Sequence, residues 1–262
     1  MTEASDSYER HHIRSLGRGL AVIRAFDEDH PRQTLSEVAR RTGLTRAAAR
    51  RFLLTLADLG YVTASDQRFE LTPRVLELGY AYLASVSLPK LSQRHLEYIA
   101  TEAQESSSVS VIDGRNVVYV ARVATRRIMT VAISVGTRFP AYATSMGRAI
   151  LASSNDDTID EYLANYALEP LTDRTITDPD LFRAELARIR EQGYAVLDQE
   201  LEPGLRSIAV PVHAADGGVV AAANLSTHTS RVSHEDLLDR LLPILREGTA
   251  RIEADLALTK RR

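Results

Sequence analysis

The sequence contains no cysteine, no tryptophan and no long apolar run. A chain without cysteine forms no disulfides and no thiolate metal sites, and it has no cysteine nucleophile. Every apolar run falls short of the roughly eighteen residues that cross a membrane. The first residues, MTEASDSYERHH, also lack the basic and apolar regions of a secretory signal. These absences predict a soluble protein of the cytoplasm that makes no contact with a membrane.

Length and composition fit two globular domains, because 262 residues, 44% of them hydrophobic, are enough for two separate cores. The formal net charge of −3 does not by itself favour nucleic acid. The charge is unevenly distributed, however, since no acid lies between Glu37 and Asp58 while several arginines do. These arginines are Arg40, Arg41, Arg46, Arg50 and Arg51. Positive potential is therefore concentrated in one short stretch.

Apolar spacing and capping signals predict three short helices at the start of the chain. The first covers residues 15–28, where apolar side chains recur at helical spacing. Thr34 and Glu37 have the spacing of a capping box, which opens a short helix that ends at Thr42-Gly43. Thr45 caps a longer helix. Its predicted core face runs to Leu59 and carries Ala49, Phe52, Leu53, Leu56 and Leu59.

The next segment has the period of β-strands and predicts a hairpin, YVTA and FEL joined by SDQR. Two helices joined by a glycine-containing turn, the second with an arginine-rich front, and a following hairpin indicate a winged helix-turn-helix. The second helix of such a domain lies in the DNA major groove. Arg50 and Arg51 are expected to bind guanine edges or phosphates, and Ala47 to approach a thymine methyl. The other predicted contacts, several of them to the DNA backbone, are Arg40, Arg41, Thr45, Arg46 and Arg68. The alternative is a solvated basic face on an ordinary three-helix domain.

The rest of the chain predicts a mixed α+β domain after a linker. Thr72-Pro73 begins a helix that is expected to reach about residue 86. Hairpin turns at Asp113-Gly114 and Asp216-Gly217 indicate a mainly antiparallel sheet. Helices are expected at 89–103, 145–153, 157–166, 179–192 and from 233, with strands near 107–112, 116–122, 127–134, 194–199, 206–213 and 218–226. The predicted plan is a disordered tail at 1–13, a winged helix-turn-helix at 14–72, a linker helix at 73–88 and an α+β domain at 89–262.

Five stretches, in order and over nearly the whole chain, carry a family resemblance. They are SLGRGLAVIRAF, TLSEVARRTGLTRAAARRFLLTLADLGYV, FELTPRVLELGYAYL, VGTRFPAYATSMGRAILA and DQELEPGLRSIAVPV. Together they resemble the IclR family of bacterial transcriptional regulators, and the second and fifth resemble its regulators of protocatechuate, 4-hydroxybenzoate and β-ketoadipate breakdown. The resemblance implies an α/β multidomain protein with a C-terminal effector-binding domain related to GAF and PAS folds. It also implies homodimers or dimers of dimers on operator DNA. Many family members have Ser or Thr where Ala47 and Ala48 stand here.

The segment SMGRAILAS predicts a helix whose first N–H groups, at 145–147, are free to hold a carboxylate. Strand alternation places Asn224 and Ser226 on one face of their strand, and Ser207 with Ala209 on one face of theirs. Small polar side chains on an inward face favour a ligand pocket, whereas strand residues that face water are an equally good interpretation of the sequence alone. The resemblance implies effector contacts at Ser145, Met146, Leu205, Ser207, Asn224 and Ser226.

The predicted effector is a small aromatic or dicarboxylic acid. Relatives that bind glyoxylate or pyruvate tend to carry Asp, Cys and Ser where this chain has Leu197, Ser207 and Asn224, so a larger acid fits better. Arg138 and Arg206 are further candidates for an anion contact, although alternation turns Arg206 away from the pocket face. Arg148 is expected to pack or pair outside the pocket.

An enzymatic function has little support in the sequence. The motifs GxSxG, GxGxxG after a strand, HExxH and the Walker loop are absent. His213 and His228 have no carboxylate in register for a zinc site. No catalytic residue, metal or cofactor is therefore expected. The predicted function is control of aromatic acid catabolism by a DNA-binding regulator; the alternatives are an IclR-type regulator that senses another organic acid, and an enzyme acting on a small organic acid.

Overall fold

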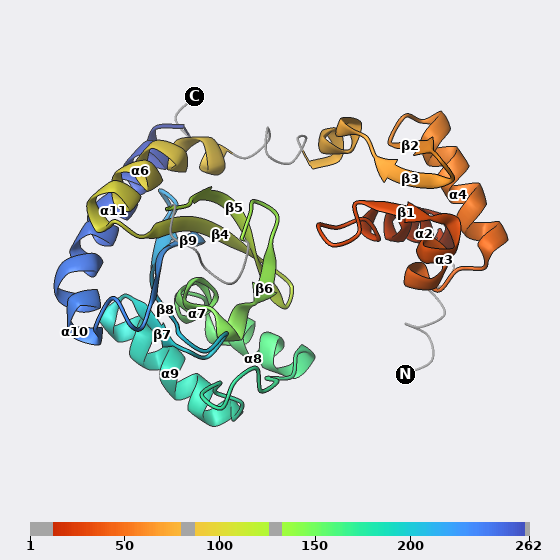
Figure 1. Cartoon of the computed structure of the whole chain (residues 1–262). Helices are drawn as coiled ribbons and strands as arrows, with labels where there is room; N and C mark the ends of the chain where they lie inside the picture. Colours follow the sequence, from red (N-terminus) through yellow and green to blue (C-terminus); the bar gives the residue numbers. More distant parts are fainter. Residues whose placement is uncertain (1–12, 80–86, 126–132, 260–262) are drawn as a thin grey trace. The chain divides into compact units, whose positions relative to one another are not determined.

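The computed structural model describes residues 13–79, 87–125 and 133–259. The chain divides into two compact units, Met1–Ala84 and Ser85–Arg262, which are coloured along the sequence in Figure 1. Nearly all of the predicted tail, the second half of the predicted linker helix and most of the predicted strand 127–134 lie outside the described residues. Among the described helices, none has the length and hydropathy needed to span a bilayer.

The first unit contains three helices, α2 (Arg14–Arg24), α3 (Leu35–Thr42) and α4 (Arg46–Asp58). Helix α3 begins with the predicted capping box: the Thr34 N–H donates to Glu37 Oε2 at 2.7 Å, and the Thr34 hydroxyl accepts from the Glu37 N–H at 3.4 Å. It ends at Gly43, whose φ of 67° lies in the left-handed region. The Thr45 hydroxyl accepts from the Ala48 N–H and caps α4. The capping signals thus confirm the predicted bounds of α3 and α4.

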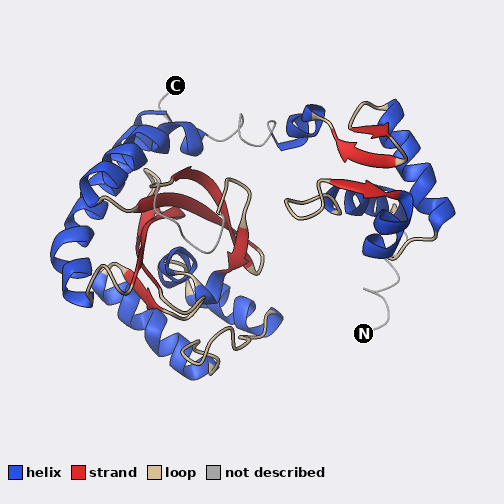
Figure 2. Ribbon diagram, viewed as in Figure 1, coloured by secondary structure: helices blue, strands red, loops and turns tan. Residues whose placement is uncertain are grey.

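A three-stranded antiparallel sheet completes this unit, in the order β1 (Arg32–Thr34), β3 (Arg68–Leu71), β2 (Val62–Ser65) (Figure 2). The predicted β2–β3 hairpin is confirmed, and Asp66 and Gln67 turn it with positive φ angles. Strand β1 was not predicted, because three residues are too few for an alternating pattern.

The core of the first unit is made by Val22, Phe26, Val38, Leu53, Leu56 and Val62. Leu59 was predicted to join this core, but its exposed fraction is 52%, so that prediction was wrong. Leu59 is the C-cap of α4 and lies past the last turn that packs on α3 and the sheet.

The second unit is built on six strands in the order β6-β5-β4-β9-β8-β7, with every neighbouring pair antiparallel. Both predicted hairpin turns are present, between β4 and β5 and between β8 and β9. The described end of predicted strand 127–134 is not strand, and the short β6 follows a few residues later. The strands are β4 (Ser106–Asp113), β5 (Asn116–Val123), β6 (Arg138–Pro140), β7 (Ala195–Asp198), β8 (Leu205–His213) and β9 (Val219–His228).

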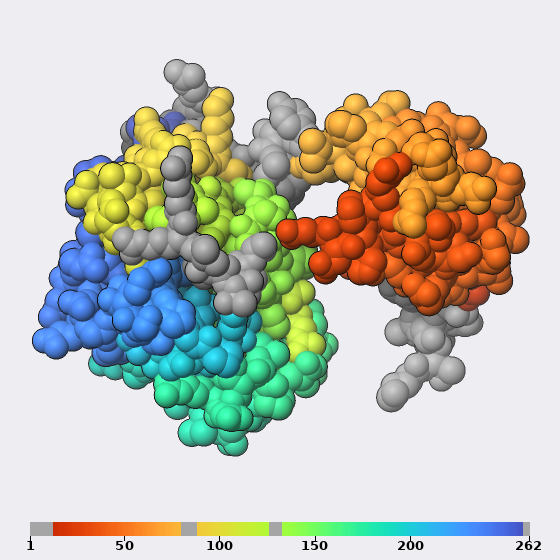
Figure 3. Space-filling model, in the orientation of Figure 1, coloured from red at the N-terminus to blue at the C-terminus, as the bar shows by residue number. Residues whose placement is uncertain are grey.

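Helices cover both faces of this curved sheet (Figure 1). Helix α6 (Ser87–Ala103) packs on one face with α11 (Leu242–Thr259), which continues from α10 (His234–Asp236) through a π-helical turn, Leu237–Leu241. Helix α7 (Ser145–Ala152) packs on the concave face, beside α9 (Pro179–Gln192); α8 (Asp156–Asn165) links α7 to α9 in the chain. Figure 3 shows the same view in space-filling form, coloured along the sequence.

Helix α7 is buried on all sides, including the charged Arg148. A Cβ atom on Gly147 would lie 2.2 Å from the carbonyl oxygen of Ala141, so only glycine allows the backbones to pass this closely. The N-terminus of α7 is therefore held close to the 3-10 turn Ala141–Ala143, and it forms one wall of the site described next.

Candidate functional site

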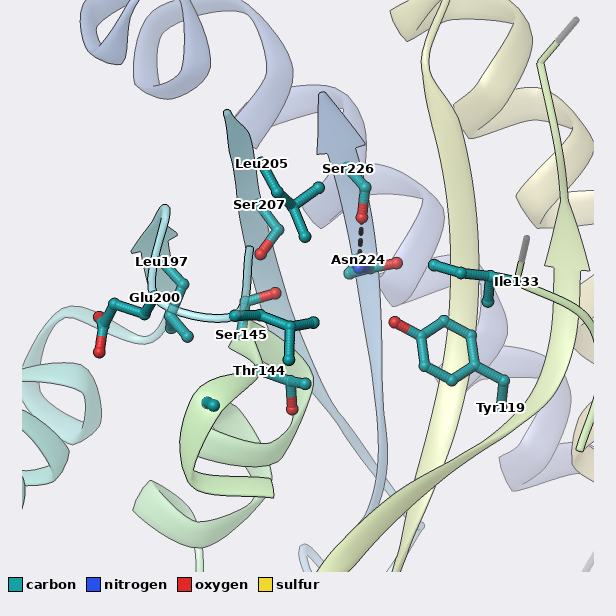
Figure 4. Close-up of a pocket in the computed structure, with 12 residues that line it drawn as sticks. Tyr119, Ile133, Thr144, Ser145, Leu197, Glu200, Leu205, Ser207, Asn224 and Ser226 are labelled. Carbon is teal, nitrogen blue, oxygen red and sulfur yellow. Dashed lines mark hydrogen bonds between the residues drawn. The ribbon is translucent and has the colours of Figure 1, made fainter. Parts of the chain in front are cut away.

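A cavity lies beside the N-terminus of α7, on the concave face of the larger sheet (Figure 4). It holds about 380 Å³ of empty space, part of which is open to solvent. The lining residues are Tyr119, Ile133, Ala143, Thr144, Ser145, Leu197, Glu200, Leu201, Leu205, Ser207, Asn224 and Ser226.

The structure brings most of the predicted effector residues together at this cavity. The alternation argument is confirmed by the register, in which Ser207 pairs with Ser226, and Asn224 with Ala209. Five of the predicted residues line the cavity, namely Ser145, Leu205, Ser207, Asn224 and Ser226.

Met146, the sixth expected effector contact, is not one of the residues that line the cavity. Its side chain is fully buried in the cluster that also contains Phe182 and Leu186. The reason is geometric: one residue advances a helix by about 100°, which turns Met146 into the core while Ser145 faces the cavity.

The polar floor of the cavity is only partly satisfied. The Asn224 amide donates from Nδ2 to the Ser226 hydroxyl at 2.9 Å. Asn224 Oδ1 and Ser145 Oγ are both buried and have no hydrogen-bond partner among the residues that the structure describes. A buried polar atom without a partner costs about 1–3 kcal/mol. Donors and acceptors are thus available at the cavity for a bound polar molecule.

The N-terminus of α7 offers fewer free N–H groups than the sequence indicates. The Thr144 hydroxyl accepts from the Gly147 N–H at 3.1 Å and caps the helix. Gly147 was predicted to hold a carboxylate, and its N–H is already occupied. The N–H groups of Ser145 and Met146 precede it and have no acceptor within the helix.

Tyr119 extends from β5 into the cavity, and its hydroxyl points toward Asn224 (Figure 4). Burial raises the pKa of this phenol to about 12, so it stays protonated at neutral pH. The sequence did not single out Tyr119, because the pairing of β5 with the neighbouring strands is not visible in a local pattern.

Three arginines considered in the sequence analysis are engaged in other contacts. Arg138 donates to Asp113 Oδ2 at 2.6 Å, and Arg206 donates to Asp198 Oδ1 at 3.1 Å, so neither candidate anion contact points into the cavity. Arg148 was expected to pack or pair outside the pocket, and it is fully buried in the domain and is not one of the lining residues. Its Nη1 donates to Glu200 Oε1 at 2.9 Å, and Glu200 is a lining residue.

A second candidate site is the exposed face of α4 in the first unit. Arg46, Ala47, Arg50 and Arg51 are all exposed on it. The side chains of these arginines, and that of Arg40 on α3, have no hydrogen bond or ion pair within the described part of the chain.

Two predicted DNA contacts are partly occupied. Arg41 forms an ion pair with Asp27 and a 2.8 Å hydrogen bond with His30 Nδ1. The hydrogen bond from His30, with the Arg41 charge as a smaller contribution, lowers the pKa of Asp27. Arg68 on β3 donates to the Arg32 carbonyl at 3.4 Å. These residues connect α3 and the wing to the rest of the unit.

Each of the two units matches a known protein domain. Residues 15–66 match the IclR helix-turn-helix domain, and residues 80–254 match the C-terminal domain of bacterial IclR transcriptional regulators. The chain belongs to the IclR family. The Pca regulon regulatory protein of Pseudomonas putida is 47% identical over 88% of this chain and 80% of its own length.

Solved structures of similar proteins share this architecture. A protein of Rhodococcus sp. RHA1 is 57% identical, covers 95% of this chain and 100% of its own, and superposes with a TM-score of 0.85. An IclR homologue from Microbacterium hydrocarbonoxydans, solved as a complex with 4-hydroxybenzoate, is 26% identical, covers 93% of this chain and 99% of its own, and has a TM-score of 0.83. The predicted fold, a helix-turn-helix unit followed by an α+β unit with an antiparallel sheet, is thus confirmed.

Proposed function

We propose that this IclR-family protein regulates transcription of genes for aromatic acid catabolism, and that a small carboxylate bound in the cavity controls it. The observation that carries the proposal is the cavity itself, whose buried Ser145 Oγ and Asn224 Oδ1 lack partners among the described residues. The Pseudomonas putida relative is a regulator of the Pca regulon, and the Microbacterium relative binds 4-hydroxybenzoate. Both names support an aromatic acid or its breakdown product as the effector.

The polar groups of the cavity select for a ligand with polar groups at both ends. Asn224 Oδ1 accepts a hydrogen bond, whereas the hydroxyls of Ser145 and Ser207 and the N–H of Ser145 donate hydrogen bonds to a ligand oxygen. Leu205 contributes an apolar wall. Hydroxybenzoates and six-carbon dicarboxylates both have oxygen at each end of an apolar middle. The cavity has no proposed catalytic role.

Calorimetry on the full chain tests the effector proposal. We expect 4-hydroxybenzoate, 3,4-dihydroxybenzoate or β-ketoadipate to bind, and Ser207→Leu and Asn224→Leu to abolish binding because each fills the cavity and removes a polar group. Thr101→Leu is the matched control, since Thr101 is exposed on α6 on the other face of the sheet. Equal affinity of both cavity variants and wild type would refute the site. Binding of a different organic acid would favour the alternative, a regulator of another catabolic operon.

DNA binding is proposed to use α4 and the wing, with operator DNA bound by a homodimer or a dimer of dimers. One such module buries little surface, and two-fold pairing doubles its contacts. Arg40, Arg41 and Arg68, with Thr45 and Arg46, are proposed to contact the DNA backbone, and Ala47, Arg50 and Arg51 to face the bases. Since the operator is chromosomal, the protein is expected to act in the cytoplasm.

Binding to operator and random DNA at several salt concentrations tests the division of roles. Arg50→Ala should cost about 1–3 kcal/mol on the operator and reduce specificity. Arg40→Ala should weaken both DNAs alike and lower the salt slope by about 0.9. If the two variants lose equal affinity on both DNAs, the assignment of base and backbone contacts is wrong.

A further inference from the structure

Arg122, on β5, is a cation inside the second unit that has no acidic partner among the described residues. Its side chain is about half buried, and its Nη1 donates to the hydroxyl of the fully buried Ser108 at 3.0 Å. Its Nε is buried and has no partner in the described part of the chain. Burial lowers the pKa of the guanidinium. Buried charges are normally paired, because desolvation without a counter-charge is costly.

The register of the sheet places Arg122 in one row with a lining residue of the cavity. Ser108 pairs with Arg122 on one side and with the lining residue Asn224 on the other. The three residues therefore form one row across β5, β4 and β9, with their side chains on the same face. Because the guanidinium bonds to Ser108, it extends along this row toward Asn224, whose Oδ1 lacks a partner among the described residues.

A β-bulge brings Tyr119 onto the same face. The register between β4 and β5 shifts at Val109/Ser110, so that Tyr119 pairs with Ser110, Ala121 pairs with Val109, and Val120 is skipped. Tyr119 and Arg122 thus share a face although they are three residues apart, an odd spacing that puts strand residues on opposite faces without a bulge. Tyr119 lines the cavity, and Arg122, which is not one of the lining residues, shares its face of β5.

We propose that Arg122 is the charge partner of the carboxylate of the acid bound in the cavity. This inference rests on the proposed function, and it names which end of the cavity holds the charge. The competing anchor is the N-terminus of α7, where Ser145 and Met146 offer two N–H groups. A helix N-terminus strengthens anion binding by about two- to thirty-fold, whereas losing one partner of a buried charge pair weakens binding by about thirty- to several-thousand-fold.

We therefore assign the carboxylate of the ligand to Arg122 and the opposite end of the ligand to the N-terminus of α7. A hydroxybenzoate bound this way directs its carboxylate to Arg122 and Tyr119, whose phenol remains a donor. Its ring hydroxyl reaches Ser145 and Ser207. A dicarboxylate places its second carboxylate on the free N–H groups of α7. Both classes of acid satisfy the unpaired guanidinium.

The test compares acids with their uncharged amides on the full chain, by calorimetry. The probes are 4-hydroxybenzoate with 4-hydroxybenzamide, and adipate with adipamide. Arg122→Met removes the cation and keeps an apolar stem, and Arg138→Met is the matched control because Arg138 pairs with Asp113 away from the cavity. We expect Arg122→Met to weaken binding of the acid by about thirty-fold or more and to leave affinity for the amide nearly unchanged. The control should change neither.

Thermal unfolding separates a ligand contact from a structural role. Without acid, Arg122→Met should unfold at the wild-type temperature or above it, because an unpaired buried cation has been removed. With acid, wild type should gain stability and the variant should not. A variant that is less stable without acid, or that keeps the wild-type preference for acid over amide, overturns the inference. If wild type binds none of the acids proposed here, the proposed function fails as well.

Discussion

Replacing Glu200 by leucine should strongly destabilise the second unit, because it would leave Arg148 as an unpaired buried cation. Arg148 is completely buried and donates two hydrogen bonds to the Glu200 carboxylate and one, at 2.7 Å, to the Tyr142 carbonyl. Glu200 in turn accepts from the Ile176 N–H at 3.1 Å. The pair thus joins α7, the 3-10 turn Ala141–Ala143 that precedes it and the segment after β7.

Removing one partner of such a pair costs about 3–5 kcal/mol, most of it the cost of the charge left behind. A unit of the size of Ser85–Arg262 loses about 2–4 °C in Tm for each kcal/mol. The expected fall for Glu200→Leu is therefore about 6–20 °C. The double variant Arg148→Met with Glu200→Leu should recover part of this loss, because no charge then remains in the interior. The Ile176 N–H and the Tyr142 carbonyl still lose a partner, so recovery should be incomplete.

Circular dichroism or scanning calorimetry on the full chain measures these transitions. Arg183→Ala is the control, because the Arg183–Asp160 pair is exposed and should be worth less than about 1 kcal/mol. A double variant that is no more stable than Glu200→Leu alone would show that the unpaired charge is not the source of the loss. A loss of less than about 1 kcal/mol for Glu200→Leu would refute the reasoning entirely.

Two other predictions concern single positions. Gly147→Ala should displace α7 and cost about 1–3 kcal/mol or more, because its Cβ would meet the Ala141 backbone, whereas Gly79→Ala, with open space around it, should be neutral or stabilising in thermal unfolding. The Thr34 N–H holds the pKa of Glu37 below its ordinary value of 4.5, so the capping box should stabilise the first unit above about pH 4.5 and lose this effect as pH falls through the lowered pKa. The difference in unfolding between wild type and Glu37→Gln should then be larger at pH 6 than at pH 3.5; a constant difference would contradict the assignment.

Local signals were sufficient for most of the first unit. Thr34, Gly43 and Thr45 start or end helices through bonds to residues within five positions, and such bonds depend only on nearby sequence. Strand β1 has no such signal, because it exists only by pairing with β3. Leu59 is the opposite case, in which a local pattern predicts burial that does not occur. It continues the apolar spacing of α4, but at this end the helix has no neighbour to cover it, and Leu59 is exposed.

The residues of the cavity were also predictable in part, where local signals bring them together. Ser207, Asn224 and Ser226 lie on adjacent strands joined by a tight hairpin, so alternation and one turn place them together. The positions of Glu200 and Arg122 depend on contacts between segments that are far apart in the sequence. In addition, the bulge near Ser110 changes which β5 residues share a face. No local period contains that information.

The cavity follows from the way α7 is buried. Its sequence, SMGRAILA, is short and mostly small, so it fits closely against a sheet face that presents Ala209 and Ala222. Two residues further along the same strands, the same face carries Ser207 and Asn224. These side chains are polar, and a close-packed apolar contact would leave them without partners, which costs more than a gap does. The packing therefore opens where small apolar residues give way to small polar ones, and this change in polarity places the cavity at the start of α7 and not along its length.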